Sequence, residues 1–332
     1  MTLVTEWERL RAQLDRQDAQ VIQRLVTAYG ESYLRLQPEI DALIEFLNLQ
    51  LETGKLISNT VAQSATFKRL VSVVEVELDT FEGYLKTEVS TASNAAARAG
   101  LSGGAFLLLA GFSDALGVPI EDVPRELVTS APDGVLDYLN EYLDKLSGRI
   151  DNLSGFHSEQ IKAGILDQVA QGYNPQKIGK WITDAYGMGL TDSMRMTRTA
   201  QLYSYREANR AMQVANADVL QGVVWSAELD DRVCMSCVAL NGKVFPVGTL
   251  CNDHHNGRCA MLPLVNGVEN PLPTGESWFV EQPEQTQLSM LGKGKFEAWK
   301  DGKFTFDQLS TVYEDEVFGE MRAVASLKSL VP

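Results

Sequence analysis

The chain has 332 residues, is 45% hydrophobic, and carries a formal charge of −15 from 29 basic and 44 acidic side chains. This length allows two or three domains with cores of their own, and the composition excludes a disordered chain. The negative charge argues against a broad surface for nucleic acid or anionic membrane. The charge is uneven, since residues 1–157 hold 13 basic and 23 acidic side chains whereas residues 191–265 hold 7 of each.

Apolar residues recur at helical spacing through the first hundred residues. From Trp7 to Leu51 the stripe is interrupted only near Pro38, which predicts two amphipathic helices. The same spacing over 64–97 predicts a third long helix, which we expect to end at a group of glycines, Gly100, Gly103 and Gly104.

Two further segments complete a helical N-terminal domain, predicted over residues 1–150. The longest apolar run, Ala105 to Phe112, is far shorter than the roughly 20 residues that a membrane span needs. We therefore expect a buried helix or a subunit contact there, and no membrane span. Residues 135–146 predict another amphipathic helix.

A second domain is predicted over residues 151–263. A helix begins at Ser158 and is capped by Gly172, and Asn174–Pro175 begins the next with favourable N-terminal residues. A separate long helix is predicted from Thr191 to about Ala217. We expect its arginines to form a solvated face, and contacts to phosphate or to an acidic protein surface are the alternative: Arg195, Arg198, Arg206 and Arg210.

The third predicted domain, residues 264–332, is an extended arm followed by short helices. Turn-forming residues are frequent from Asn266 to Gly275, and helices are expected over 276–291 and 296–298. We expect the arm to reach a neighbouring subunit, with Trp278 and Phe279 as anchors, because large aromatic side chains dominate interface energetics.

All four cysteines and two of the three histidines fall between Cys234 and Cys259. A Cys-x-x-Cys pair places two thiolates on one tight turn, and a nearby loop can supply the other ligands of a tetrahedral zinc site. Residues 223–227 and 243–245 read as short strands beside this pair, with Asn241–Gly242 as the turn. The fold class predicted is thus mainly α, with a small zinc-stabilised α+β module.

A structural zinc ion is the leading interpretation of this cluster, and disulfides or idle thiols are the alternatives. Residues 1–7 lack the features of a secretory signal, so we expect no oxidising compartment. A catalytic zinc ion keeps a position open for water, whereas this cluster has ligands enough to close the site. Cys234 and Cys237 are the expected ligands, with two more from Cys251, His254, His255 and Cys259.

Several short motifs follow one another in a fixed order between residues 161 and 263: Arg198–Thr199, Trp225, Asp230–Cys237, Gly242–Phe245 and His254–Cys259. In this order they resemble the Mu F-like minor head proteins, or head-morphogenesis proteins, of tailed bacteriophages. The tail also resembles the extension that often follows this module, through Trp278, Gln282–Glu284, Gln287, Leu291–Gly292, Gly302 and Leu309.

The chain departs from this family at one position of the closing motif. The family's His-x-x-Cys-Arg-Cys has Gly257 here in place of its first cysteine. Cys251, six residues earlier, is free to replace that ligand. The ligand set that we predict is therefore Cys234, Cys237, Cys251 and Cys259, with His254 as the competing fourth ligand.

The resemblance implies a structural virion protein with no enzymatic activity and neither catalytic nor cofactor-binding residues beyond the zinc ligands. It would be made in the cytoplasm of the bacterial host, lie in the capsid near the portal vertex in several copies, and assist head assembly and genome packaging or ejection. The expected partners are the portal protein, the major capsid protein or both, with transient contact to phage DNA as a further candidate. The alternatives are a DNA-binding zinc protein that acts on the phage genome and a toxin or other enzyme that carries a Mu F-like module.

Overall fold

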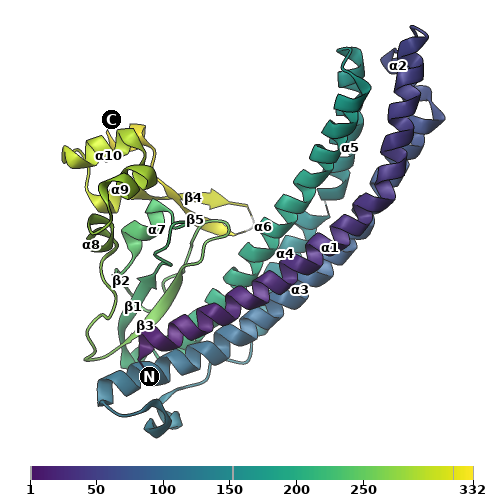
Figure 1. The fold of residues 1–332 in the computed structure, drawn as a ribbon. Helices are drawn as coiled ribbons and strands as arrows, with labels where there is room; N and C mark the ends of the chain where they lie inside the picture. The colour runs from purple at the N-terminus through teal and green to yellow at the C-terminus, as the bar shows by residue number, and fades with distance from the viewer. Residues whose placement is uncertain (1, 152, 317, 332) are drawn as a thin grey trace. The chain divides into compact units, whose positions relative to one another are not determined.

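The computed structural model describes residues 2–151, 153–316 and 318–331. It is mainly helical with two small antiparallel sheets (Figure 1), which confirms the predicted fold class. Contacts divide the chain into two compact units. Unit 1 comprises residues 1–16, 93–142 and 199–332, and unit 2 comprises residues 17–92 and 143–198. The division into three domains by sequence stays a prediction.

The first helix, α1 (Leu3–Glu52), is continuous through Pro38, so the predicted break there is wrong. A proline inside a helix costs about 3 kcal/mol because it removes a hydrogen bond and crowds the preceding turn. The buried residues Leu36, Ile40 and Leu43 lie on both sides of it. Burial of each such side chain contributes about 1.5–3 kcal/mol, which outweighs the cost of the proline.

A short helix, α2 (Ser58–Gln63), precedes α3 (Ala65–Leu116), which continues past its glycines, so the end predicted at Gly100 is also wrong. A Cβ atom on Gly100 would lie 2.3 Å from the carbonyl oxygen of Tyr205, and one on Gly104 would lie 2.8 Å from Oδ1 of Asn209. The glycines therefore allow α3 to approach its neighbour closely instead of ending it.

Helix α3 is also long and apolar enough to cross a membrane by length and composition, with a window of mean hydropathy 1.4 of which 56% is buried. Leu107, Leu108 and Ala110 are each 0% exposed within unit 1. Burial of this kind is also found in the core helices of soluble proteins, and the absence of a membrane span stays a prediction.

The helices that follow include two 3-10 turns, η1 (Ile120–Asp122) and η2 (Arg125–Leu127), then α4 (Val135–Ile150) and α5 (Leu153–Ala170). Gly172 follows α5 with a φ of 74°, as expected for a C-terminal cap. Helix α6 (Pro175–Ala215) begins where predicted, with the amide of Gln176 donating to Oδ1 of Asn174 at 2.9 Å. It is one helix rather than two, because no break occurs at Thr191.

After the 3-10 turn η3 (Ala217–Val219), strand β1 (Leu220–Ser226) is the centre of a three-stranded sheet of order β2-β1-β3. Its pairing with β2 (Val244–Phe245) was predicted, but the connection contains a helix, α7 (Met235–Leu240). The sequence reading missed strand β3 (Ala260–Val265), which pairs antiparallel with β1. Because β3 is an edge strand, it tolerates Pro263.

The C-terminal segment forms α8 (Gly275–Val280), α9 (Glu284–Leu291), α10 (Lys293–Lys300), η4 (Phe306–Leu309), a hairpin of β4 (Ser310–Asp315) and β5 (Gly319–Val324), and α11 (Leu327–Leu330). The short helices were expected, but the hairpin was not. In Figure 1 these elements surround α7.

Helix α7 and the C-terminal segment share one hydrophobic core. Met235, Val238 and Ala239 of α7 are buried in a cluster with Phe279 and Leu291. Phe279 is 0% exposed, so its predicted role as an anchor on another subunit is wrong.

The predicted arm, residues 266–275, lies against the segment that follows α7. Asn241 donates to the carbonyl of Pro273 at 2.9 Å and its own carbonyl accepts from Gly275 at 3.0 Å. The arm therefore packs on the cysteine module, the part of residues 151–263 that carries the four cysteines, and does not reach away from it.

Candidate metal centre

The Cys-x-x-Cys pair lies at the N-terminus of α7. Cys234 is the N-cap residue, and its Sγ accepts a hydrogen bond from the amide of Cys237 at 3.4 Å. One turn of helix brings the two sulfur atoms to 3.2 Å from each other. Cys237 is 2% exposed, whereas Cys234 is only partly buried. The pair thus presents two thiols from a rigid turn, as the spacing predicted.

The loop between β2 and β3 supplies the facing donors. The donor atoms of Cys234, Cys237 and His254 lie within 4.8 Å of one another, and so do those of Cys237, Asp253 and Cys259. Cys237 belongs to both groups, so the two form one cluster. The described residues therefore place Cys234, Cys237 and Cys259 with His254 or Asp253 where they could hold a metal ion.

Two of the sequence candidates have other surroundings. Cys251 is buried but belongs to neither group of donors among the described residues. His255 turns to the C-terminal hairpin, where its Nε2 lies 3.2 Å from Oδ2 of Asp315. All four cysteines are free, so the structure shows no disulfide within the described chain.

Mutual hydrogen bonding changes the acidity of the cluster. A hydrogen bond with Cys237 lowers the pKa of Cys234 to about 5, and a hydrogen bond with Cys234 raises the pKa of His254 to about 9. Burial raises the pKa of Cys251 and of Cys259 above the ordinary thiol value. Because a metal ligand must be deprotonated, a cation bound at Cys234 and His254 would displace the proton of His254.

Arg206 of α6 is buried beside the cluster, so the prediction that it belongs to a solvated face is wrong. Only 7% of its side chain is exposed, and it lies 3.1 Å from Oδ2 of Asp253. Arg195 and Arg198 are considerably more exposed, at 49% and 39%. Helical spacing alone did not distinguish Arg206 from these two. Asp253 was missed because a single aspartate between ligand candidates has no motif of its own.

A second arginine joins the two segments that carry the cysteines. Arg258, next to Cys259, donates to Asp230 at 2.6 and 2.8 Å and also contacts Glu228. This hydrogen bonding holds the pKa of Asp230 well below its usual range. These ion pairs hold the segment before α7 against the loop between β2 and β3, which carries Cys259.

The C-terminal hairpin supports the same loop from another direction. Asn252 contacts Glu320 and accepts from Nε of Arg322 at 3.2 Å. Ser236 of α7 hydrogen-bonds with Ser310 at 2.8 Å. The C-terminal extension is therefore part of the structure that positions the cluster.

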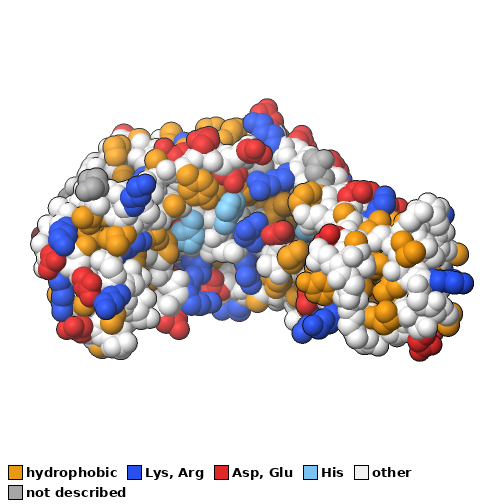
Figure 2. Space-filling model, turned by 90° about the horizontal axis from the view of Figure 1, so that it is seen from above, with side chains coloured by type: hydrophobic (Ala, Val, Ile, Leu, Met, Phe, Trp, Pro, Cys, Tyr) orange, Lys and Arg blue, Asp and Glu red, His pale blue; other side chains and the backbone are white. Residues whose placement is uncertain are grey.

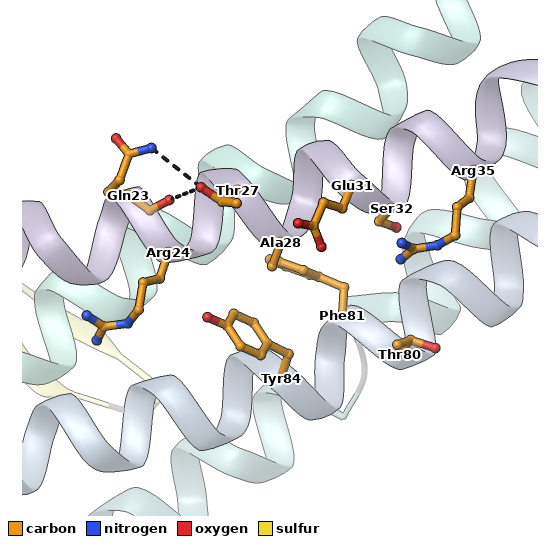
Figure 3. Close-up of a pocket in the computed structure, with 10 residues that line it drawn as sticks. All are labelled: Gln23, Arg24, Thr27, Ala28, Glu31, Ser32, Arg35, Thr80, Phe81 and Tyr84. Atoms are coloured by element: carbon orange, nitrogen blue, oxygen red, sulfur yellow. Dashed lines mark hydrogen bonds between the residues drawn. The ribbon is translucent and has the colours of Figure 1, made fainter.

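A groove of roughly 430 Å³ in unit 2 is a different kind of feature, lined by α1 and α3 (Figure 3). Arg24 and Arg35 lie at its two ends, with Tyr84 and Phe81 between them. Both arginines are already paired, with Glu88 and Glu77, at 2.8 Å each. Such pairing leaves them little charge for an anionic ligand, and the groove gives no basis for a catalytic assignment.

Comparisons with protein-family models, curated proteins and solved structures found no match for this chain.

Proposed function

We propose that the chain is a structural, zinc-binding head-morphogenesis protein of a tailed bacteriophage, associated with the portal and the head interior. The observation that supports the metal part is that two donor groups, Cys234–Cys237–His254 and Cys237–Asp253–Cys259, share Cys237. From these donors we propose three thiolates and the imidazole of His254 as the ligands. These are the soft donors that zinc prefers, and four of them close a tetrahedral site. The phage part is supported by the order of the Mu F-like motifs.

A structural role for the metal fits the packing around it. The sheet β2-β1-β3 and helix α7 are small elements joined by loops, and such regions often need a metal to fold. Cys237 and Cys259 are 2% and 4% exposed, which leaves little room for a substrate on that side. The zinc ion would join the N-terminus of α7 to the loop before β3.

The proposed partners are the portal protein, the major capsid protein or both. The surface supports recognition of protein more than of nucleic acid, because acidic and basic side chains are interspersed on the face in Figure 2. The formal charge of −15 further weakens any broad contact with phosphate groups. In this proposal the protein is made in the host cytoplasm and incorporated in several copies near the portal vertex.

The proposal is tested by analysing purified phage particles and the purified protein together. We expect the chain to be found in mature particles by mass spectrometry and the reduced, folded protein to contain about one zinc ion per chain. Absence of the chain from mature particles would overturn the virion role. A folded, reduced protein without zinc would overturn the metal site.

A further inference from the structure

Arg206 reaches from α6 into the loop that carries the proposed ligands His254 and Cys259. Its Nε donates to the carbonyl oxygen of Cys259 at 2.8 Å. Its Nη2 donates to the carbonyl oxygen of Gly257 at 2.8 Å and to Oδ2 of Asp253 at 3.1 Å. One side chain from a long helix thus holds three acceptors of a single loop.

Asp253 extends this network to the backbone of both ligands. Its Oδ1 accepts from the amide of His254 at 2.8 Å, and its Oδ2 accepts from the amide of Cys259 at 3.0 Å. In the metal-free site the thiol of Cys237 also donates to Oδ1 at 3.2 Å, a hydrogen bond that is lost when Cys237 is deprotonated to bind a metal. Since the Asp253 side chain is 0% exposed, it depends on these donors for compensation of its buried charge.

The loop has a glycine where the carboxylate needs space. A Cβ atom on Gly257 would lie 2.1 Å from Oδ2 of Asp253 and 2.2 Å from its Cγ. Any other residue at 257 would displace the carboxylate or the loop. Position 257, where the motif that the sequence resembles has a cysteine, therefore has a glycine that leaves space for the Asp253 carboxylate.

Charge gives Arg206 a further effect on the metal. A zinc ion with three thiolates and a neutral imidazole carries one net negative charge, and the Asp253 carboxylate beside it carries another. Burying two like charges without a cation is costly. Arg206 is the buried cation next to them.

We propose that Arg206 and Asp253 form a buried pair that positions His254 and Cys259 for the metal, with Arg206 also offsetting the negative charge of the loaded site. This inference rests on the proposed metal site. Arg206 and Asp253 are positioning residues, and neither is a ligand. Groups that orient metal ligands typically change metal affinity by about 10- to 100-fold.

The test measures zinc affinity of the full chain by competition with a chromophoric chelator, and the ligand set by the absorption spectrum of the cobalt-substituted protein. Arg206→Gln should weaken zinc binding by about 10- to 100-fold while the cobalt spectrum at saturation stays that of the wild type. The control is Arg210→Gln, since Arg210 lies one turn further along α6 and bonds to Glu207 at 2.8 Å. It should bind zinc as the wild type does.

Two more variants keep the test decisive if Arg206→Gln fails to fold. Arg206→Lys keeps the charge but loses the planar fork, so it should bind zinc more weakly than the wild type and more tightly than any folded Arg206→Gln protein. Asp253→Asn should weaken binding with an unchanged cobalt spectrum.

Three results would overturn the inference in different ways. Wild-type zinc affinity in folded Arg206→Lys and Asp253→Asn would remove the positioning role. A changed cobalt spectrum in Asp253→Asn would make Asp253 a ligand. A wild-type chain that binds no zinc would instead remove the proposed metal site on which the inference depends.

Discussion

At the scale of single residues, the Cys-x-x-Cys spacing predicted that the thiols of Cys234 and Cys237 lie close together, because one turn of chain links them directly. The fourth ligand could not be chosen in this way, since Cys251 and His254 both lie at chelating distances along the sequence. In the proposed site, local contacts favour His254. Asp253 holds the backbone of His254 and Cys259, whereas Cys251 lies outside both donor groups. Neither bond could be predicted from the sequence.

The choice of ligand is tested by His254→Ala and Cys251→Ser. We expect His254→Ala to lose zinc to a chelator much faster than the wild type, because a tetrahedral site with three protein ligands is open to water. Cys251→Ser should retain the metal. Loss of zinc from Cys251→Ser with retention in His254→Ala would restore the set of four cysteines.

At the scale of elements, periodicity located the long helices but misplaced their ends. The predicted breaks at Pro38 and Gly100 rest on the local cost of proline and glycine in a helix. In the structure that cost is outweighed by burial around Pro38 and by close packing at Gly100. A glycine can end a helix or let another helix pack closely against it. At Gly100 the outcome depends on a packing partner, Tyr205, that lies more than a hundred residues away. The hairpin β4–β5 was missed for a related reason, because no residue of β4 and only Met321 of β5 is buried.

Substitutions at two glycines of α3 distinguish the packing role of a glycine from its intrinsic cost in a helix. Gly100→Ala should destabilise the protein by about 1–3 kcal/mol, because its Cβ atom would lie 2.3 Å from the backbone oxygen of Tyr205. Gly83→Ala is the matched control, since Gly83 lies on the same helix with nothing within 4 Å of the added atom. It should stabilise by about 0.5–1 kcal/mol. Urea denaturation measures both, and equal effects would contradict the packing role.

The C-terminal helices give a second prediction at this scale. Phe279→Ala should destabilise unit 1 by about 3–5 kcal/mol and promote loss of zinc, because Phe279 is 0% exposed in the core that it shares with α7. Val280→Ala is the control, since Val280 is 54% exposed, and it should change stability by less than about 0.5 kcal/mol. If Phe279→Ala left unfolding unchanged but reduced incorporation into particles, the original role as a docking anchor would be restored.

At the scale of the whole molecule, distant segments combine in ways that composition does not indicate. Leu10 near the start of the chain shares a core cluster with Tyr205 of α6 and Leu262 of β3. The amphipathic stripe predicted that Leu10 is buried, but not which partner covers it. The predicted arm likewise packs on the cysteine module, because the amide of Gly275 donates a hydrogen bond to the carbonyl of Asn241. A composition rich in turn-forming residues does not indicate such a contact.

The central claim, that the chain is held together at Cys234, Cys237, His254 and Cys259 by one zinc ion, is tested most directly by X-ray absorption at the zinc edge on reduced, full-length protein. We expect three sulfur neighbours at about 2.3 Å and one nitrogen neighbour at about 2.0–2.1 Å. Four sulfur neighbours, or a site completed by oxygen in place of nitrogen, would contradict it.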